Sequence, residues 1–251
     1  MKKTILIYFN NITMEVALIF WGLTRSLKYT IESIQQNILN VLSNNKIKYK
    51  IFMHTYKIEG LYSNKHAYER PIKLDPFEYK FLNPDYLILD NQEKIIQSLK
   101  MEKYKKGKDP WNNNYQTLQN YILAMYSKNK IITTYENQLQ NFQYFFFLRP
   151  DVLYLKPFDI KILKKINISN CLIPNFSHNG GVNDRMFISK FNYAIKYGKL
   201  FQDLDNYDFL HSETVLKKYL EKNNIDIILI DFFFTRIRTN GRKCLKDNFN
   251  C

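Results

Sequence analysis

The sequence predicts an α/β protein with a mostly parallel central sheet flanked by helices, built as one domain over residues 1–251. First, short apolar runs alternate with segments of helical periodicity, an order typical of parallel sheets. Second, hydrophobic residues make up 45% and aromatic residues 16% of the chain, which provides a sizeable core and excludes a mostly disordered protein. Third, the three cysteines are too few for a disulfide scaffold.

The first quarter of the chain reads as a strand, a helix and a second strand. Residues 16–21 are an unbroken apolar run, and residues 49–55 are the second strand candidate. Between them, apolar side chains recur every three or four positions from Leu27 to Leu42, which marks one face of a helix. The apolar residues within positions 1–9 also read as a strand.

The rest of the chain continues this alternation. Further strands are expected at residues 86–89, 142–148, 152–155, 171–174, 225–230 and 232–237. Further helices are expected at residues 93–99, 115–125, 191–204 and 213–220. Stretches rich in charge, proline, glycine or asparagine at residues 57–84, 103–114 and 177–184 read as loops.

The formal charge is strongly positive, since 37 basic residues minus 23 acidic residues give +14. Such a charge is found in nucleic-acid-binding proteins. Here, however, lysine greatly outnumbers arginine, and asparagine and isoleucine are abundant, as an A- and T-rich genome favours. Recognition of phosphates or bases favours arginine. We therefore expect the charge to attract anionic small molecules rather than nucleic acid.

The cysteines and the apolar runs indicate the cellular compartment of the protein. Cys171, Cys244 and Cys251 read as reduced thiols, with a bridge between the last two as the alternative. The apolar runs at residues 1–9 and 16–23 are too short or too interrupted to span a bilayer. These features predict a cytoplasmic chain without a transmembrane segment.

The loop after the first strand is a candidate anion site. A ligand in an open parallel sheet binds beyond the carboxyl ends of the strands, and a helix start there offers free N–H groups. Gly22 permits a close backbone approach, Thr24 or Ser26 can cap the helix, and Arg25 can pair with a phosphate. An ordinary turn with a surface arginine is the alternative.

Arg149 and Asp151 follow the most apolar run of the chain. A carboxylate at the end of a central strand lies in the ligand crevice of the sheet, so Asp151 can hold a divalent ion. Arg149 can face diphosphate oxygens. A strand-end ion pair is the alternative.

The third candidate is a polar loop that is suited to reading sugar hydroxyls. Its two glycines permit close ligand approach, and its neighbours carry hydrogen-bonding groups. The residues are His178, Asn179, Gly180, Gly181, Asn183, Asp184 and Arg185. An Asn-Gly turn is the alternative.

Two more short motifs carry candidate residues. His54 and Thr55 end the second strand, where they can contact a base or ribose, although a structural histidine fits equally well. Glu213 begins a late helix and can act as a general base, and the nearby His211 can hold a metal or phosphate. Helix capping at Ser212 is the structural alternative.

Several common motifs are absent from the sequence. It has no P-loop, no Gly-x-Gly-x-x-Gly, no Gly-x-Ser-x-Gly and no His-Glu-x-x-His. These absences argue against the commonest NTPases, dehydrogenases, esterases and zinc proteases.

Taken together, the motifs resemble those of GT-A fold glycosyltransferases, closest to a small group found in polysaccharide loci and in large DNA viruses. The resemblance spans residues 16–240. It rests on Gly-x-x-Arg-Ser at 22–26, Phe-x-His-Thr-aromatic at 52–56, Arg-Pro-Asp at 149–151, Gly-Gly-x-Asn-Asp-Arg at 180–185 and Ser-Glu at 212–213. The departure is that these enzymes typically carry Asp-x-Asp, whereas this chain has Arg-x-Asp.

The resemblance implies transfer of a sugar from a nucleoside-diphosphate sugar, such as a UDP-sugar, to a glycan or glycoprotein acceptor. It implies a Rossmann-like nucleotide-binding half over residues 1–110, and a metal, acceptor and closing half over residues 111–251. Mn²⁺ or Mg²⁺ would be held by Asp151 and His211, and the catalytic base would be Asp184 or Glu213. A viral origin would place the chain in the host cytoplasm.

Two other classes of function stay open. A sugar- or nucleotide-binding module without turnover is compatible with the incomplete metal motif. A basic nucleic-acid-binding protein is the second alternative, and a steep salt dependence of its affinity for DNA or RNA would identify it.

Overall fold

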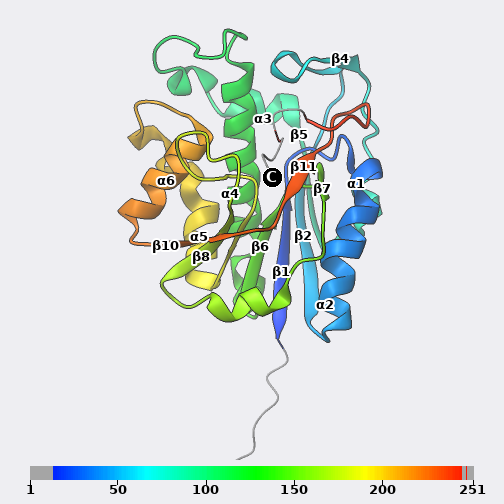
Figure 1. Cartoon of the computed structure of the whole chain (residues 1–251). Helices are drawn as coiled ribbons and strands as arrows, with labels where there is room; N and C mark the ends of the chain where they lie inside the picture. Colours follow the sequence, from blue (N-terminus) through cyan, green and yellow to red (C-terminus); the bar gives the residue numbers. More distant parts are fainter. Residues whose placement is uncertain (1–13, 245–246, 248–251) are drawn as a thin grey trace, which may run out of the picture.

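A seven-stranded sheet forms the centre of the protein, as the computed structural model shows (Figure 1). The structure describes residues 14–244 and residue 247, so the strand expected within residues 1–9, and Cys251, lie outside the described residues. The strand order is β10-β8-β9-β6-β1-β2-β5. The bounds are β1 (Glu15–Trp21), β2 (Lys48–Lys57), β5 (Tyr86–Asn91), β6 (Tyr144–Leu148), β8 (Asn170–Pro174), β9 (Phe187–Ser189) and β10 (Asp226–Ile230).

The pairing within this sheet is mostly parallel. β1 pairs in parallel with β2 and β6, β2 with β5, and β8 with β10, whereas β9 runs antiparallel to both of its neighbours. The expected α/β class, with a mostly parallel sheet flanked by helices, is confirmed. The carboxyl ends of β1, β2, β5 and β6 therefore lie at one edge of the sheet, the upper edge in Figure 1.

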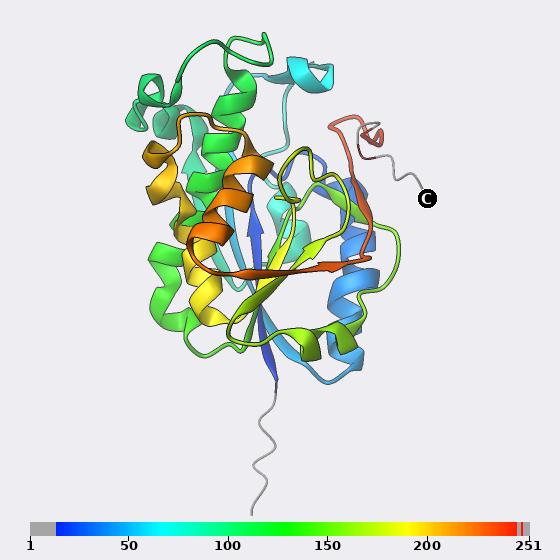
Figure 2. The same ribbon diagram turned by 60° about the vertical axis from the view of Figure 1, so that its left-hand side comes forward.

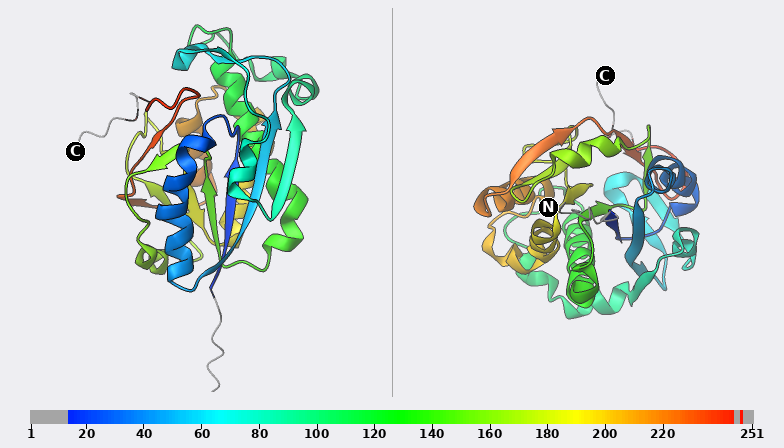
Figure 3. Two further views of the ribbon diagram at one scale, coloured as in Figure 1. Left: turned by 90° about the vertical axis from the view of Figure 1, so that its right-hand side faces the viewer. Right: turned by 90° about the horizontal axis from the view of Figure 1, so that it is seen from below.

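Helices cover both faces of the sheet (Figures 1 and 3). The α-helices are α1 (Leu27–Ile34), α2 (Asn40–Asn44), α3 (Gln92–Ser98), α4 (Gln116–Leu139), α5 (Phe191–Lys199) and α6 (Ser212–Lys222). Short π or 3-10 turns lie at Gln35–Leu39, Lys65–Ala67, Glu78–Leu82, Met101–Tyr104, Ile160–Lys165 and Leu200–Asn206. Helices α1 and α2 lie on one face, and α4, α5 and α6 lie on the other.

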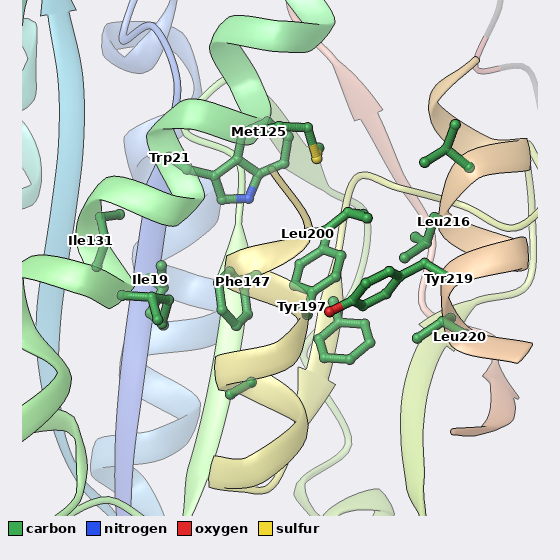
Figure 4. Close-up of a cluster of buried hydrophobic side chains, with 14 of the residues drawn as sticks. Ile19, Trp21, Met125, Ile131, Phe147, Tyr197, Leu200, Leu216, Tyr219 and Leu220 are labelled. Atoms are coloured by element: carbon green, nitrogen blue, oxygen red, sulfur yellow. The ribbon is translucent and has the colours of Figure 1, made fainter. Parts of the chain in front are cut away.

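The alternation of side chains along β1 explains why its sequence is apolar throughout. Ala17, Ile19 and Trp21 pack against α4, α5 and α6, and the intervening residues pack against the opposite layer that contains α1. A strand that is buried on both faces has no polar face. Figure 4 shows the first of these layers, with Trp21 at the end of β1 beside Met125 of α4.

The chain also contains strands that were not predicted from the sequence, and one predicted strand that lies outside the main sheet. The expected loop over residues 57–84 contains the antiparallel pair β3 (Tyr62–Asn64) and β4 (Glu69–Ile72). The strand expected at 232–237 is β11 (Phe234–Arg236), which pairs with β7 (Val152–Tyr154) in a separate ribbon beside α1 (Figure 2). Strand β9 was not expected.

Within residues 14–244, no helix has the length and apolar character needed to cross a membrane. Cys171 and Cys244 are both free and buried.

Candidate functional site

A cavity of about 210 Å³ opens at the carboxyl ends of the parallel strands. It is lined by residues that follow β1 and β6, by one face of α4, by the first turn of α6 and by residues at the end of β11. Its volume far exceeds what one water molecule or one ion needs. Because ligands of open parallel sheets bind at this edge, the cavity is the candidate functional site.

A chain of hydrogen bonds holds the loop after β1 from inside the protein. Gly22 N donates to Ser127 Oγ at 3.0 Å, Ser127 Oγ lies 2.8 Å from His54 Nδ1, and His54 Nε2 lies 3.1 Å from Asp90 Oδ2. Burial lowers the pKa of His54 more than Asp90 raises it, so the ring is neutral at pH 7. A neutral ring has one N–H, which therefore points to the Asp90 carboxylate. Gly22 has a φ of +93°, a conformation that favours glycine.

Both carboxylate oxygens of Asp151 accept hydrogen bonds from arginine. Arg149 donates from Nε to Oδ1 and from Nη2 to Oδ2, each at 2.8 Å, and Arg25 Nη2 donates to Oδ2 at 3.0 Å. Burial works to raise the pKa of Asp151, but Arg149, Arg25 and Arg236 outweigh burial and hold that pKa well below its usual range. Asp151 is therefore an anion at neutral pH that orients two guanidinium groups.

A second buried acid holds two further arginines. Asp247 Oδ1 lies 2.8 Å from Arg236 Nη2 and 3.2 Å from Arg185 Nη1. Burial of Asp247 works to raise its pKa, but the hydrogen bonds from Arg236 and the charge of Arg185 outweigh burial and lower it. This carboxylate therefore holds both guanidinium groups at the cavity.

Arginine is concentrated at this cavity. Five of the seven arginines of the chain line it, whereas none of its thirty lysines does. The lining arginines are Arg25, Arg149, Arg185, Arg236 and Arg238. A third buried acid, Glu69, lies 3.7 Å from both Arg25 and Arg238. The other two arginines, Arg70 and Arg242, are exposed. The guanidinium fork suits phosphate geometry, so this distribution favours a phosphorylated ligand.

Three residues that line the cavity carry a buried polar atom without a hydrogen-bond partner in the described part of the chain. These atoms are Trp21 Nε1, Arg25 Nε and Tyr121 OH. Buried polar groups are nearly always satisfied, so several unsatisfied ones around one cavity need an explanation. Each carries a hydrogen to donate, so what each of them lacks is an acceptor oxygen.

The two candidate bases differ in how firmly the protein holds them. Glu213 is buried, and its carboxylate accepts hydrogen bonds from Asn179 Nδ2 at 2.7 Å and from Ser212 Oγ at 2.6 Å. Asp184 is half-buried on the cavity wall, and its carboxylate makes no hydrogen bond or ion pair with the described residues. Asp184 is therefore the less firmly held of the two carboxylates, and its role as a base stays a prediction.

The glycine pair packs the polar loop against the start of α6. A Cβ atom on Gly181 would overlap the backbone carbonyl of Glu213, and the next residue, Val182, donates from N to that same oxygen at 3.1 Å. The close approach therefore needs glycine at position 181. Through Gly181 and Asn179 the loop holds the helix start that carries Glu213.

Replacing Gly181 with alanine is therefore expected to destabilise the fold. The added methyl group must displace backbone, and overpacking of this kind costs about 1–3 kcal/mol of unfolding free energy. Chemical denaturation measures the change. Gly60→Ala is the matched control, because a Cβ there meets nothing and the φ is ordinary. Equal stability of the two variants would contradict the packing described here.

The cavity brings together seven of the residues singled out from the sequence. These are Gly22, Arg25, Arg149, Asp151, Asp184, Arg185 and Glu213. The others do not line its wall: Thr24, His54, Thr55, His178, Asn179, Gly180, Gly181, Asn183 and His211. His54 and Thr55 are buried behind it. Direct ligand contact by these nine residues stays a prediction, and the contacts of His54, Asn179 and Gly181 favour positioning roles.

The sequence reading missed several lining residues. Thr117, Asn120 and Tyr121 come from α4, and Arg236 and Arg238 come from the end of the chain. An Arg-x-Arg pair puts both side chains on one face of an extended segment. In a chain with so few arginines, that pair was a signal that could have been used.

The expected divalent-ion site does not fit the residues at this place. Both oxygens of Asp151 are bonded to guanidinium groups, which would repel a cation beside them. His211 lies 3.6 Å from Glu213 and packs near Trp111 and Phe209. Among residues 14–244 and 247, no group of three or more His, Cys, Asp or Glu side chains could hold a metal ion.

Comparison with known proteins gives similarity in fold alone. No family model and no curated protein matches the sequence. The Mn/GDP form of core-mannan synthase A from Aspergillus fumigatus is similar over 88% of this chain and 74% of that chain, with 10% identity and a TM-score of 0.48. The apo form of mouse xyloside xylosyltransferase 1 is similar over 86% and 85%, with 9% identity and a TM-score of 0.44. What the cavity binds is therefore inferred from its own residues.

Proposed function

We propose that this protein is a glycosyltransferase that moves a sugar from a nucleoside-diphosphate sugar to a hydroxyl group of an acceptor such as a glycan. The observation that carries the proposal is the arginine-lined cavity at the carboxyl edge of the sheet. Its guanidinium groups suit a diphosphate. Its unpaired donors suit the oxygens of a diphosphate and of sugar hydroxyls.

In the proposed reaction, the bond between the anomeric carbon and the diphosphate oxygen breaks, and a bond from that carbon to the acceptor oxygen forms. The leaving diphosphate keeps the electron pair and gains negative charge, which the arginines stabilise. The proton of the acceptor hydroxyl passes to the Asp184 carboxylate. The anomeric carbon passes through an oxocarbenium-like transition state, and direct displacement inverts its configuration.

Incubating the protein with UDP- and GDP-sugars tests this function. The expected result is thermal stabilisation by at least one donor, and release of UDP or GDP when a suitable acceptor glycan is present. Failure of every UDP- and GDP-sugar to bind would contradict the assignment of the cavity to a nucleoside diphosphate.

A binding module without turnover is the second candidate. It is favoured by Asp151, whose engagement by Arg25 and Arg149 leaves the usual metal position of such enzymes without a free carboxylate. The two candidates agree on donor binding and differ in turnover. Tight binding of a donor sugar, with no release of nucleoside diphosphate across an acceptor panel, would favour the binding module.

Arg25→Ala is expected to weaken the binding of UDP or GDP by about 1.5–3 kcal/mol, the range for hydrogen bonds to charged groups. The Arg25 side chain is buried between Asp151, Glu69 and the Tyr62 hydroxyl, yet its Nε has no partner among the described residues. Calorimetry measures the affinity. Arg70→Ala is the control, since Arg70 is exposed and lies outside the cavity. Equal affinities of both variants for UDP or GDP would mean that the loop at residues 22–25 is an ordinary turn that does not bind the nucleotide.

The division of the chain into a nucleotide-binding half and an acceptor half stays a prediction. The cavity takes Arg25 from the first 110 residues and its other arginines from the remainder. Both halves would therefore contribute to the diphosphate site, with the acceptor expected on the side of Asp184 and α6.

A further inference from the structure

The carboxylate of Asp151 is occupied by arginine side chains. Its two oxygens accept three hydrogen bonds, all from guanidinium groups, and the residue is almost fully buried. A carboxylate that binds a divalent cation must offer that cation a free lone pair in a region of negative charge. Here Arg149 forms a bidentate pair with the carboxylate from only two residues away. Asp151 therefore acts on the arginines.

Charge at the cavity leads to the same conclusion. Five arginines are paired with three buried carboxylates, those of Asp151, Asp247 and Glu69. The guanidinium groups thus exceed the acids that they pair with by two positive charges. Asp184 and Glu213 also line the cavity and offset this excess over the cavity as a whole, but neither has an arginine within ion-pair distance among the described residues, so the excess stays within the arginine cluster.

The unpaired donor of Arg25 shows that this arginine is not saturated by its acids. Arg25 Nε is buried without a hydrogen-bond partner among the described residues, and so is the neighbouring Trp21 Nε1. Arg185 is 5% exposed and lines the cavity. Arg149 lies over the Trp21 ring, 5.1 Å from its centroid, which fixes the guanidinium plane at the wall. Preorganised donors of this kind stabilise a developing anion without reorganisation.

We infer that the arginine cluster takes the place of a divalent cation: guanidinium groups neutralise the diphosphate, and Asp151 is the positioning residue that orients Arg25 and Arg149. This inference rests on the proposed function, since it concerns the same diphosphate. It makes donor binding independent of Mn²⁺ and Mg²⁺.

Calorimetry of the full chain with UDP and with GDP tests this inference under three conditions: with EDTA, with Mg²⁺ and with Mn²⁺. The expected result is the same affinity in all three. Binding that appears only with Mn²⁺ or Mg²⁺ would overturn the metal-free site and leave the proposed function standing. If neither nucleotide binds under any condition, the proposed function fails, and this inference fails with it.

Two variants separate the role of a positioning residue from that of a metal ligand. Asp151→Asn is expected to weaken binding about 10- to 100-fold in EDTA, as loss of charge-assisted hydrogen bonds implies. A metal ligand at this position would leave metal-free binding unchanged. Arg149→Lys keeps the positive charge and removes the planar guanidinium group, and we expect a similar loss of nucleotide affinity. Arg70→Lys, outside the cavity, is the control. Thermal unfolding shows that each variant is folded, and unchanged binding by a folded Arg149→Lys would overturn the inference.

Discussion

Asp184→Asn is expected to reduce sugar transfer by about 100-fold or more, the contribution of a general base, while the affinity for UDP or GDP stays unchanged. The substitution keeps the shape of the side chain and removes its ability to accept a proton. Asp184 lies half-buried on the cavity wall, and its carboxylate has no partner among the described residues. Transfer rates and calorimetric affinities, measured on the same preparation, give both quantities.

Glu213→Gln is the comparison that decides between the two candidate bases. Asn179 and Ser212 already donate to the Glu213 carboxylate, so we expect this variant to lose less transfer activity than Asp184→Asn. If Glu213→Gln abolishes transfer and Asp184→Asn does not, the roles are exchanged. Normal transfer by both variants would mean that the reaction retains configuration or that another group is the base.

The strands and helices of the first half of the sheet could be predicted because local pattern and final position agree. The run at 16–21 is β1, and the apolar stripe from Leu27 to Leu42 lies in the helical segment of α1, the π turn and α2. Burial on both faces makes a central parallel strand apolar throughout, and burial on one face makes a helix periodic. Both signals are contained within a few neighbouring residues.

The two errors of topology concern pairing between distant segments. β9 has three residues, Phe187–Ser189, and it lies between β6 and β8, antiparallel to both. β11 was expected as a strand, but its partner is β7, and the pair lies outside the main sheet. Periodicity describes which faces of a strand are buried and carries no information about its partner.

The candidate site was predictable where a polar residue follows a buried strand. Arg25, Arg149 and Asp151 were found in this way, and all three line the cavity. Trp21 was overlooked because an aromatic residue at a strand end reads as core, and Arg238 because the last segment has no periodicity. The metal expected at Asp151 came from its position, whereas its carboxylate is held by Arg149, the strand-end ion pair that was the alternative, and by Arg25, more than a hundred residues earlier.

A buried lysine behind the cavity wall provides the second large effect. Lys128 is fully buried, its Nζ lies 4.1 Å from the centre of the Trp21 ring, and it donates to the Tyr197 hydroxyl at 2.7 Å. Burial lowers the pKa of Lys128 from 10.5 to about 7, although the charge of Asp184 opposes this shift. Above pH 7 the unfolded chain therefore binds a proton at this residue that the folded chain does not hold.

Lys128→Met is expected to stabilise the protein at pH 7 by several kcal/mol, since each pKa unit corresponds to about 1.4 kcal/mol. Because the unfolded state binds more protons between pH 7 and 10.5, the stability of the wild type rises with pH in this window. The advantage of the variant should therefore shrink by about 1.5–2 kcal/mol between pH 7 and 8.5. Urea denaturation at several pH values measures this difference.

The difference in unfolding free energy between the wild type and Lys128→Met reports on Lys128 alone, because the contributions of groups that titrate in both proteins cancel. Above pH 9 the buried Cys171, whose pKa is raised to about 12 by burial, lowers the stability of both alike, so the comparison is best made below that pH. Lys130→Met is the matched control for the loss of one lysine, because Lys130 lies two residues along α4 and is only half-buried. A constant gap between wild type and Lys128→Met from pH 7 to 8.5 would mean that Lys128 is charged in the folded state. Its ammonium group would then be stabilised by Trp21 and Asp184 in spite of burial, and the wall behind the cavity would carry one more positive charge.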